Sequence, residues 1–595
     1  MSSDKGNETS QSLPNPSFPF NILPRYSALL LLGMASKSRL RLDSHRGPIS
    51  RTSSTYVRKR ATKACQVCRA RRTKCDQQRP ACSFCVKAGV ECVFDLDERA
   101  TFDQASLAII DRLDRLERKI DAQSQSVMPD IPGQTLPRNQ INENLFFFPC
   151  TVDRVLQWDV FRDASSPNLT VSTQQSLASQ PQGGNDNAET SWVGDILDRT
   201  LCDRWLDNFF AHIHVKNPIL DETETRRLVS RLCARGLDWD VESGLALLVC
   251  ANGAIARPLQ ETLPFSHSDR RMAISLLSAA QRRLGGGLGP TGLIQAQCAF
   301  LSGVLLMSLM RPVEAWTTFV HGLAICQAFA CTQQRDHDVG QMGSREASEQ
   351  SVLWACWKSE QELRLELGMS NFTCLADDPP ELFPNPPEGC EGHVEQAWYF
   401  YLSEIALWRL EVNARRLMTQ IQHEDWPSVS KAISEIGQDA SDQLETWKTT
   451  LPPLVSIHQG AEDDVIRFVL RGRITYIHEL VSWPFIHVAL NRIAECDLAE
   501  HETAAALSFH YDRLLVNEPG YYHRHHGTWL MLRTSARSAC ILLGFARMYP
   551  GSSLLPSGWK NTVLGTLKMV EYWSNEAEGM LSVLQSMTWL FQTIQ

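Results

Sequence analysis

Apolar residues recur at helical spacing along most of the chain. From about residue 191 to residue 595 they repeat every three or four positions, and no strand-like alternation continues for more than a few residues. Arg311-Pro312 interrupts one such run and Gly368 follows another, as is typical of helix ends. We predict an all-α domain over 191–595, with helices at 244–256, 272–284, 348–367, 398–422, 463–494, 503–516, 527–548 and 561–592 and a helical hairpin over 292–330.

The chain before residue 191 has a different pattern. Residues 123–190 are rich in Gln, Ser, Pro and Asn and are expected to be a mostly disordered linker, and residues 1–57 a disordered tail. One apolar stretch, Val155-Leu156-Gln157-Trp158-Asp159-Val160-Phe161, interrupts the linker and is expected to dock on the helical domain. We also expect the natural start to be Met34, shortly before the basic region.

A short apolar stripe occupies the region 96–122, which we predict to be a linker and a short coiled coil. Its members follow Phe102 at heptad-like spacing, with charged residues between them, and are Ile109, Leu113, Leu116 and Ile120. These residues are the candidate dimerisation contacts. An amphipathic helix that docks on its own chain is the alternative interpretation.

Six cysteines within residues 65–92 carry the most specific chemistry. They follow C-x2-C-x6-C-x6-C-x2-C-x6-C, which is one half written twice, and are Cys65, Cys68, Cys75, Cys82, Cys85 and Cys92. Two tetrahedral zinc ions need eight bonds, and six thiolates supply them if two sulfurs bridge both metals. The pattern therefore predicts a cluster of two Zn2+ ions, which would replace the apolar core that so short a module lacks.

The cysteines also allow other interpretations. A disulfide scaffold fits small secreted proteins, whereas this chain has 595 residues and 18 cysteines, most of the others scattered. A catalytic or redox thiol would need a sulfur that is not consumed as a ligand. A zinc site used only for protein contacts is a further alternative. No apolar run is long enough for a membrane span, so no membrane partner is expected.

Charge separates this region from the rest of the chain. Between Tyr56 and Val93 there are ten Lys or Arg and two acidic residues, although the whole chain has a net charge of −9. Such a basic island on an acidic protein is typical of nucleic-acid binding. The run Arg58-Lys59-Arg60 indicates a nuclear localisation signal, and its alternative role is to bind phosphate.

The cysteine spacing, the run Arg69-Ala70-Arg71-Arg72-Thr73-Lys74 and the string Arg79-Pro80-Ala81-Cys82 resemble the fungal binuclear zinc cluster transcription factors. The resemblance implies that Cys65 and Cys82 bridge the metals and that a helix after Cys68 reads a CGG-type triplet. By position it assigns base reading to Arg71 and Arg72 and phosphate contacts to Arg69 and Lys74, with Lys63 also at the DNA. It places Pro80 in the loop between the halves, often as a cis proline.

Weaker strings extend this resemblance to the helical domain, which in the family tunes activity. They are 353–360, 401–407 and 525–529. We therefore predict a zinc cluster DNA-binding domain at 58–95, followed by an all-α regulatory domain. The expected function is that of a nuclear, non-enzymatic transcription regulator. Its expected partners are double-stranded DNA, the transcription machinery and a second copy of the chain in a homodimer. The alternative is a zinc-stabilised scaffold protein acting through its helices.

Two further motifs are interpreted as structural loops and not as binding sites. Residues 287–292 match G-x-G-x-x-G, but a predicted helix and not a strand precedes them, so we interpret them as a loop between helices. His523, His525 and His526 are close enough in sequence to suggest a metal site. A loop at a helix entry, with a hydrogen-bonded histidine, is the favoured interpretation.

Overall fold

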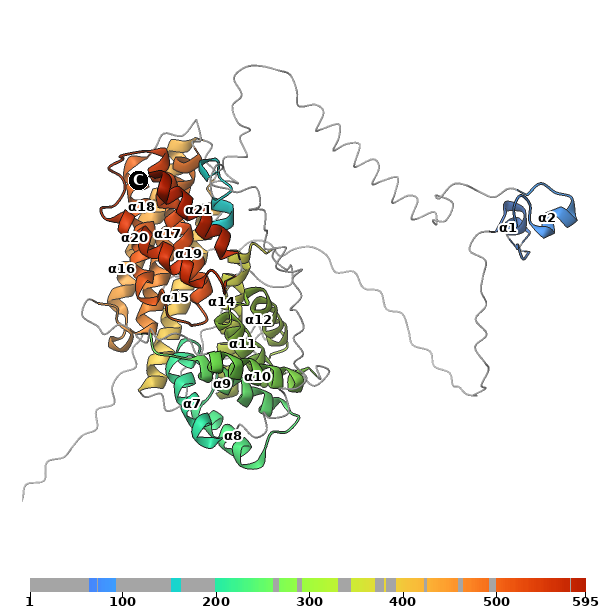
Figure 1. The fold of residues 1–595 in the computed structure, drawn as a ribbon, viewed down its shortest axis with the longest axis horizontal. Coiled ribbons are helices and arrows are strands. Elements are labelled where there is room, and N and C mark those ends of the chain that lie inside the picture. The colour runs from blue at the N-terminus through green and yellow to red at the C-terminus, as the bar shows by residue number, and fades with distance from the viewer. Residues whose placement is uncertain are drawn as a thin grey trace, which may run out of the picture. The chain divides into compact units, whose positions relative to one another are not determined.

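The computed structural model describes residues 64–71, 73–76, 78–92, 151–161, 198–259, 267–285, 292–329, 344–369, 379–380, 392–421, 425–458, 464–491, 499–577 and 579–594. The chain divides into two compact units, Met1–Ile131 and Pro132–Gln595, which are described separately (Figure 1). Within the described ranges every regular element is a helix. The predicted fold class, a small cysteine cluster followed by an all-α domain, is confirmed.

The first unit contains two short helices, α1 (Gln66–Ala70) and α2 (Ser83–Ala88). Each begins directly after a cysteine, and α2 ends at Gly89, which adopts φ +63° and donates its N–H to the last turn. The buried apolar residues of this unit, as far as it is described, are five cysteines. A module with this composition needs a metal in place of an apolar core.

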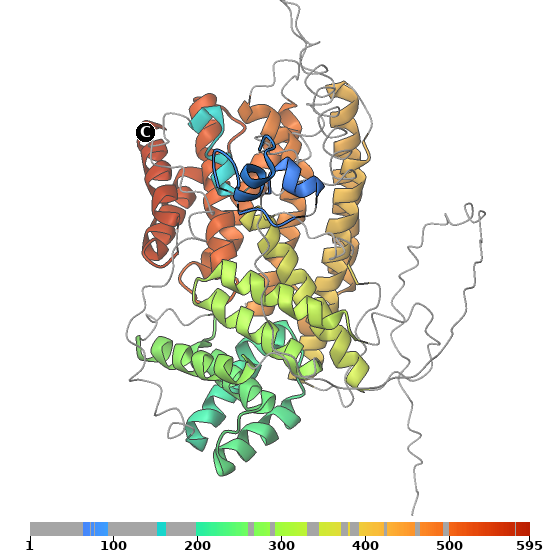
Figure 2. The same ribbon diagram turned by 90° about the vertical axis from the view of Figure 1, so that its right-hand side faces the viewer.

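The second unit is a helical array in two lobes. Figure 2 shows the green helices α7–α12 gathered at one end and the orange and red helices α16–α21 at the other. The first lobe contains α7 (Arg199–His212), η5 (His214–Lys216), α8 (Glu222–Arg235), α9 (Val241–Ile255), α10 (His267–Leu284), α11 (Leu293–Ser308) and α12 (Pro312–Cys326). The long helices α14 (Ser344–Leu367) and α15 (His393–Thr419) follow.

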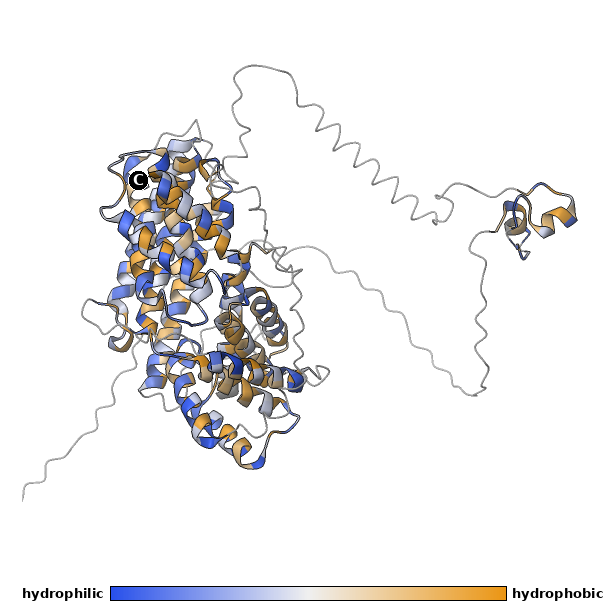
Figure 3. Cartoon of the chain, viewed as in Figure 1, coloured by the Kyte–Doolittle hydropathy of each residue, from blue (hydrophilic) through white to orange (hydrophobic). Residues whose placement is uncertain are grey.

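The second lobe is built from the remaining helices. They are α16 (Trp426–Thr450), η6 (Pro453–Val455), α17 (Val465–Asn491), α18 (Glu500–Asn517), η7 (Glu518–Gly520), α19 (Thr528–Met548), α20 (Trp559–Trp573) and α21 (Met580–Ile594). Apolar and polar residues lie side by side on the outer helices (Figure 3). One continuous apolar core runs through both lobes. None of the described helices combines the length and apolarity needed to span a bilayer.

The helix boundaries agree with most of the sequence-based predictions. The hairpin over 292–330 is α11 and α12, with Pro312 as the first residue of α12. Gly368 has φ +64° directly after α14, which starts four residues earlier than predicted. The prediction of one helix over 561–592 is wrong: α20 ends at Trp573 and α21 begins at Met580, with Gly579 at φ +80° between them.

The apolar stretch in the linker docks on the second lobe, as predicted. It forms α5 (Val152–Val155) and η2 (Asp159–Phe161), which pack against α19. Trp158 lies against Trp483, with ring centroids 5.6 Å apart. Phe161 is fully buried against Gly544, where a Cβ atom would come within 2.7 Å of its ring. Gly544 is therefore required for this contact.

Charged side chains also lie inside the second lobe. Glu479 of α17 is fully buried and accepts hydrogen bonds from Arg513 of α18 and Arg537 of α19. Arg537 also forms an ion pair with Glu366 of α14, at 3.5 Å. Burial raises the pKa of Glu479, but the nearby Arg513, His510 and Arg537 outweigh it and hold the pKa at about 2. These pairs connect helices that are distant in sequence.

Candidate metal centre and nucleic-acid interface

The six predicted cysteines converge in the first unit as two overlapping groups of four. One group contains Cys65, Cys68, Cys75 and Cys82, and the other contains Cys65, Cys82, Cys85 and Cys92. Within each group all four sulfur atoms lie within 4.8 Å of one another. Cys65 and Cys82 belong to both groups, which is the arrangement that two metal ions with two bridging ligands require.

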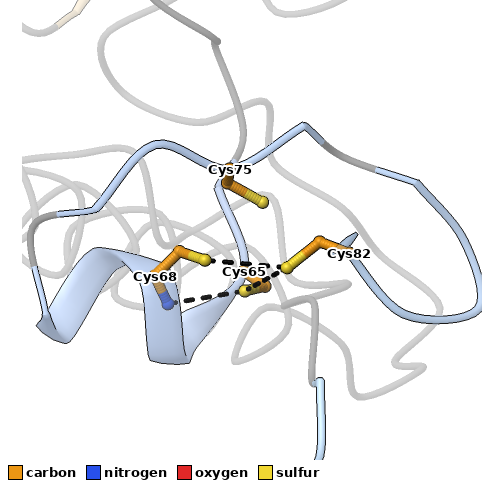
Figure 4. A group of neighbouring side chains, drawn as sticks. All are labelled: Cys65, Cys68, Cys75 and Cys82. Atoms are coloured by element: carbon orange, nitrogen blue, oxygen red, sulfur yellow. Dashed lines mark hydrogen bonds between the residues drawn. The ribbon is translucent and has the colours of Figure 1, made fainter. Parts of the chain in front are cut away.

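The sulfur separations fit tetrahedral zinc. The sulfur of Cys82 lies 3.7 Å from that of Cys65 and 3.6 Å from that of Cys68 (Figure 4). The sulfur of Cys65 lies 3.6 Å from that of Cys85. A tetrahedron with Zn–S bonds of about 2.3 Å has edges of about 3.8 Å. A disulfide would bring two sulfurs to about 2 Å, so these contacts fit metal ligation and not cross-linking.

The local sequence positions the two shared sulfurs at helix starts. Cys65 directly precedes α1, and Cys82 is the N-cap residue of α2. The backbone N–H of Cys68 donates to the sulfur of Cys65 at 3.4 Å and lowers the pKa of that thiol. A backbone hydrogen bond from Cys85 does the same for Cys82. Both shared thiols are thus favoured as thiolates, the form that binds metal.

Asp76 is a residue that the sequence reasoning missed, having counted it only as an acid. Its carboxylate accepts hydrogen bonds from the backbone N–H of Ser83, at 3.1 Å, and from the Ser83 hydroxyl. It also accepts from the N–H of Gln78, at 3.5 Å. These bonds, chiefly the one from the Ser83 hydroxyl, lower the pKa of Asp76. Asp76 thereby ties the end of the first half to the start of α2.

The structure describes only some of the basic residues that are predicted to contact DNA. Arg71 is exposed at the end of α1, where its backbone N–H donates to the carbonyl of Val67. Lys74 is exposed in the segment that follows. The backbone of Arg69 lies in α1, whereas Lys63 and Arg72 lie outside the described residues. The Arg79–Pro80 peptide bond in the loop between the halves is cis.

Some sequence-based predictions fall on residues that the structure does not describe. The stripe of Ile109, Leu113, Leu116 and Ile120 lies outside the described residues, as does the run Arg58-Lys59-Arg60. The same holds for most of residues 287–292. These predictions stay predictions.

Comparison with known proteins identifies the cysteine module. Residues 63–100 match the fungal Zn(2)-Cys(6) binuclear cluster domain, a family that binds two zinc ions. The geometry of the six sulfurs fits that metal content, so zinc is the cofactor of this unit.

Several curated proteins are similar to parts of the chain. A putative transcription factor ecdB of Aspergillus rugulosus is 27% identical over 267 residues, which are 44% of this chain and 46% of that protein. The oleate-activated transcription factor 1 of Saccharomyces cerevisiae is 40% identical over 75 residues, 12% of this chain and 7% of that protein. The citrinin biosynthesis transcriptional activator mrl3 of Monascus ruber is 35% identical over 82 residues, 13% of this chain and 16% of that protein.

The matches thus span less than half the length of these curated relatives. Their names are those of transcription factors and not of enzymes, in agreement with the prediction from the sequence. The chain therefore contains a fungal Zn(2)-Cys(6) binuclear cluster domain and is similar, over part of its length, to fungal transcription factors.

Proposed function

We propose that this protein is a DNA-binding transcription regulator that reads CGG-type triplets through the first unit. In this proposal the zinc ions hold Cys65–Cys92 in one conformation, so that α1 and the residues after it face the major groove. Arg71 and Arg72 would each donate two hydrogen bonds to O6 and N7 of guanine. Arg69, Lys74 and Lys63 would contact phosphates, which adds affinity and salt dependence but little sequence preference.

The observation that carries this proposal is the pair of overlapping four-sulfur groups beside exposed basic residues. The two four-sulfur groups join cysteines at α1 with cysteines at α2, and Arg71 and Lys74 are exposed in the same unit. A zinc site for protein contacts alone would not require a net charge of +8 within 38 residues, on a chain whose net charge is −9. Nucleic acid is the partner that this charge pattern fits.

The wider role follows from the relatives. Their names include an activator of citrinin biosynthesis and an oleate-activated factor. We accordingly propose that this chain acts in the nucleus as an activator of a pathway or secondary-metabolite gene cluster, through the transcription machinery. A homodimer formed through Ile109, Leu113, Leu116 and Ile120 is part of the same proposal.

The test is binding of the zinc-loaded full chain to a CGG duplex and to a scrambled duplex over a range of salt concentrations. Arg72→Ala and Arg71→Ala should each reduce the preference for CGG by ~1–3 kcal/mol. Lys87→Ala is the matched control, because Lys87 is an exposed cation on α2. It should leave the ratio of the two affinities unchanged.

Two outcomes would contradict the proposal. If Arg72→Ala and Arg71→Ala both keep full discrimination between the duplexes, base reading lies elsewhere. If the zinc-loaded protein binds neither duplex at low salt, the first unit is not a DNA-binding domain. The scaffold interpretation, in which the helical unit carries the function, would then be favoured.

A further inference from the structure

Large apolar side chains are exposed close together where α18, η7 and α20 meet. They are Leu515 of α18, Tyr522 shortly after η7, and Leu564 and Tyr572 of α20, and each is exposed to between 40% and 48%. Helices α18 and α20 pack side by side (Figure 1). Single exposed apolar residues are common on proteins, whereas a group of them indicates a contact surface.

The hydrogen bonds of Tyr521 hold these four residues in one place. Its hydroxyl donates to the carbonyl of Leu514 at 3.2 Å and lies 2.9 Å from the hydroxyl of Thr566. Its carbonyl accepts the indole N–H of Trp573 at 2.7 Å. Each of the four exposed residues is one or two positions from Tyr521 or from one of these partners. They therefore form one surface, which we call the α18–α20 patch.

Two tyrosine rings of the α18–α20 patch are held against each other. The rings of Tyr522 and Tyr572 meet edge to face, with centroids 5.2 Å apart. The ring of Tyr572 also meets that of Trp573, which is buried, at 4.9 Å. A tyrosine fixed in this way loses little conformational freedom when a partner covers it. Exposed aromatic rings in fixed positions are typical of the residues that anchor protein–protein contacts.

Gly565 of α20 leaves open space beside the α18–α20 patch. A Cβ atom added here would meet nothing within 4 Å beyond the adjoining backbone of α20. Glycine inside a helix is unfavourable compared with alanine. Every other described glycine with such open space has a positive φ, which gives it a backbone reason. The packing of the described helices gives no reason for glycine at 565, whereas close approach of another molecule would.

Charged residues of α20 are arranged symmetrically about Gly565. Lys560 lies five positions before it and Glu571 six positions after it, and both side chains are exposed. The two are eleven positions apart, close to three helical turns, so they lie on the same side of α20. When two copies of α20 cross antiparallel at Gly565, the cation of each therefore lies level with the acid of the other.

We propose that a second copy of this chain binds the α18–α20 patch, with the two α20 helices crossing antiparallel at Gly565. Such a two-fold contact requires one surface to contain both members of every pair. This surface has projecting rings, an open position, and a cation and an acid at matching distances from that position. A strongly charged partner would lack this match. The contact deepens the homodimer of the proposed function and rests on it, but it lies in the helical unit and not at 109–120.

The test is sedimentation of the zinc-loaded full chain without DNA, over a range of protein concentrations. The parent should show a reversible equilibrium between monomer and dimer. Tyr572→Glu and Gly565→Gln should each weaken the dimer roughly 10-fold or more, as expected for residues at the centre of an interface. Ile274→Glu is the control, at an apolar residue of α10 that is exposed to 39%, and should associate like the parent.

Gly565→Gln separates a role in the interface from a role in folding. Glutamine is a better helix former than glycine, and the space around this position is open. At low concentration, where the parent is also monomeric, the thermal midpoint of the helical circular dichroism signal should stay the same or rise. The weaker dimer is then not a result of misfolding.

Exchanging charges tests the antiparallel crossing. Lys560→Glu and Glu571→Lys should each weaken self-association about 3- to 10-fold, because like charges then face each other. An equal mixture of the two variants should recover the affinity of the parent, since each copy then offers the charge that the other lacks. A mixture as weak as either variant alone would contradict this arrangement.

Two results would overturn the proposal. The first is a monomeric parent at every concentration. The second is equal self-association of the parent and of folded Tyr572→Glu and Gly565→Gln, and loss of the dimer in Leu113→Glu would then assign the contact to the stripe at 109–120. Binding to a duplex with a single CGG triplet separates this failure from that of the proposed function, because monomeric variants should keep the preference for CGG.

Discussion

The two units of this protein fold on different physical grounds. In the first unit, the described buried apolar residues are five cysteines, arranged as two four-sulfur groups. In the second unit, one apolar core runs through both lobes and charged pairs such as Glu479–Arg537 are buried inside it. The comparison teaches that metal ligation replaces the hydrophobic core in one unit and is not needed in the other.

Removing zinc should have the largest effect and should separate the units. A structural zinc site contributes ~10–16 kcal/mol to folding in finger peptides, far more than two short helices could supply otherwise. Chelation should therefore unfold the first unit and abolish duplex binding. Far-ultraviolet circular dichroism should change little, because the helices of the second unit dominate that signal. Collapse of the whole helical signal would refute the independence of the units.

Glu479→Gln should destabilise the second unit and leave the first unit unchanged. This change leaves Arg513 and Arg537 buried without their shared carboxylate, so the second unit should lose about 3–5 kcal/mol of unfolding free energy. Zinc content and duplex affinity should stay as in the parent, measured by metal analysis and binding titration. The control is Glu445→Gln on α16, whose exposed pair with Lys448 is expected to contribute less than about 1 kcal/mol.

Acidification should weaken the second unit through its buried histidines. Burial lowers the pKa values of His510 and His523 from 6.5 to about 4, so below pH 6.5 the unfolded chain binds protons that the folded chain does not. The unfolding free energy should fall between pH 6.5 and 4, by about 1 kcal/mol per pH unit for each histidine. Denaturant titrations at several pH values measure this slope. His510→Asn should flatten it, and an unchanged slope would exclude this origin.

Asp76→Asn should give the smallest effect and should sharpen the description of the first unit. The neutral amide keeps the shape of Asp76 but weakens its bonds to Ser83, so the first unit should become slightly less stable. Competition with a chelator should show easier zinc loss, while the preference for CGG stays. Glu91→Gln, at an exposed acid in the same unit, is the control and should behave like the parent.

Local features were predictable from the sequence. Ligand number and spacing led to six converging cysteines because each half closes over a few residues. Helix ends at Pro312 and Gly368 were equally visible, since proline and glycine limit helices through their own backbone geometry. The sequence-based prediction missed the break between α20 and α21. Two signals mark this break: the polar stretch that follows Trp573, and Gly579 directly before α21.

Long-range features were not predictable. The partners Glu479 and Arg537 are 58 positions apart, and no local pattern pairs them. The same applies to Phe161 and Gly544, whose fit depends on the absence of one carbon atom. Asp76 and its partner Ser83 belong to different halves of the cysteine repeat, so periodicity did not connect them. Such contacts depend on how distant segments pack together in space, which the sequence around each residue does not reveal.

The sharing of Cys65 and Cys82 between the two sulfur groups also has a consequence for chemical modification of the cysteines. An electrophile that alkylates Cys65 or Cys82 would remove a ligand from both four-sulfur groups. Alkylation of Cys75 or Cys92 would remove a ligand from one group only.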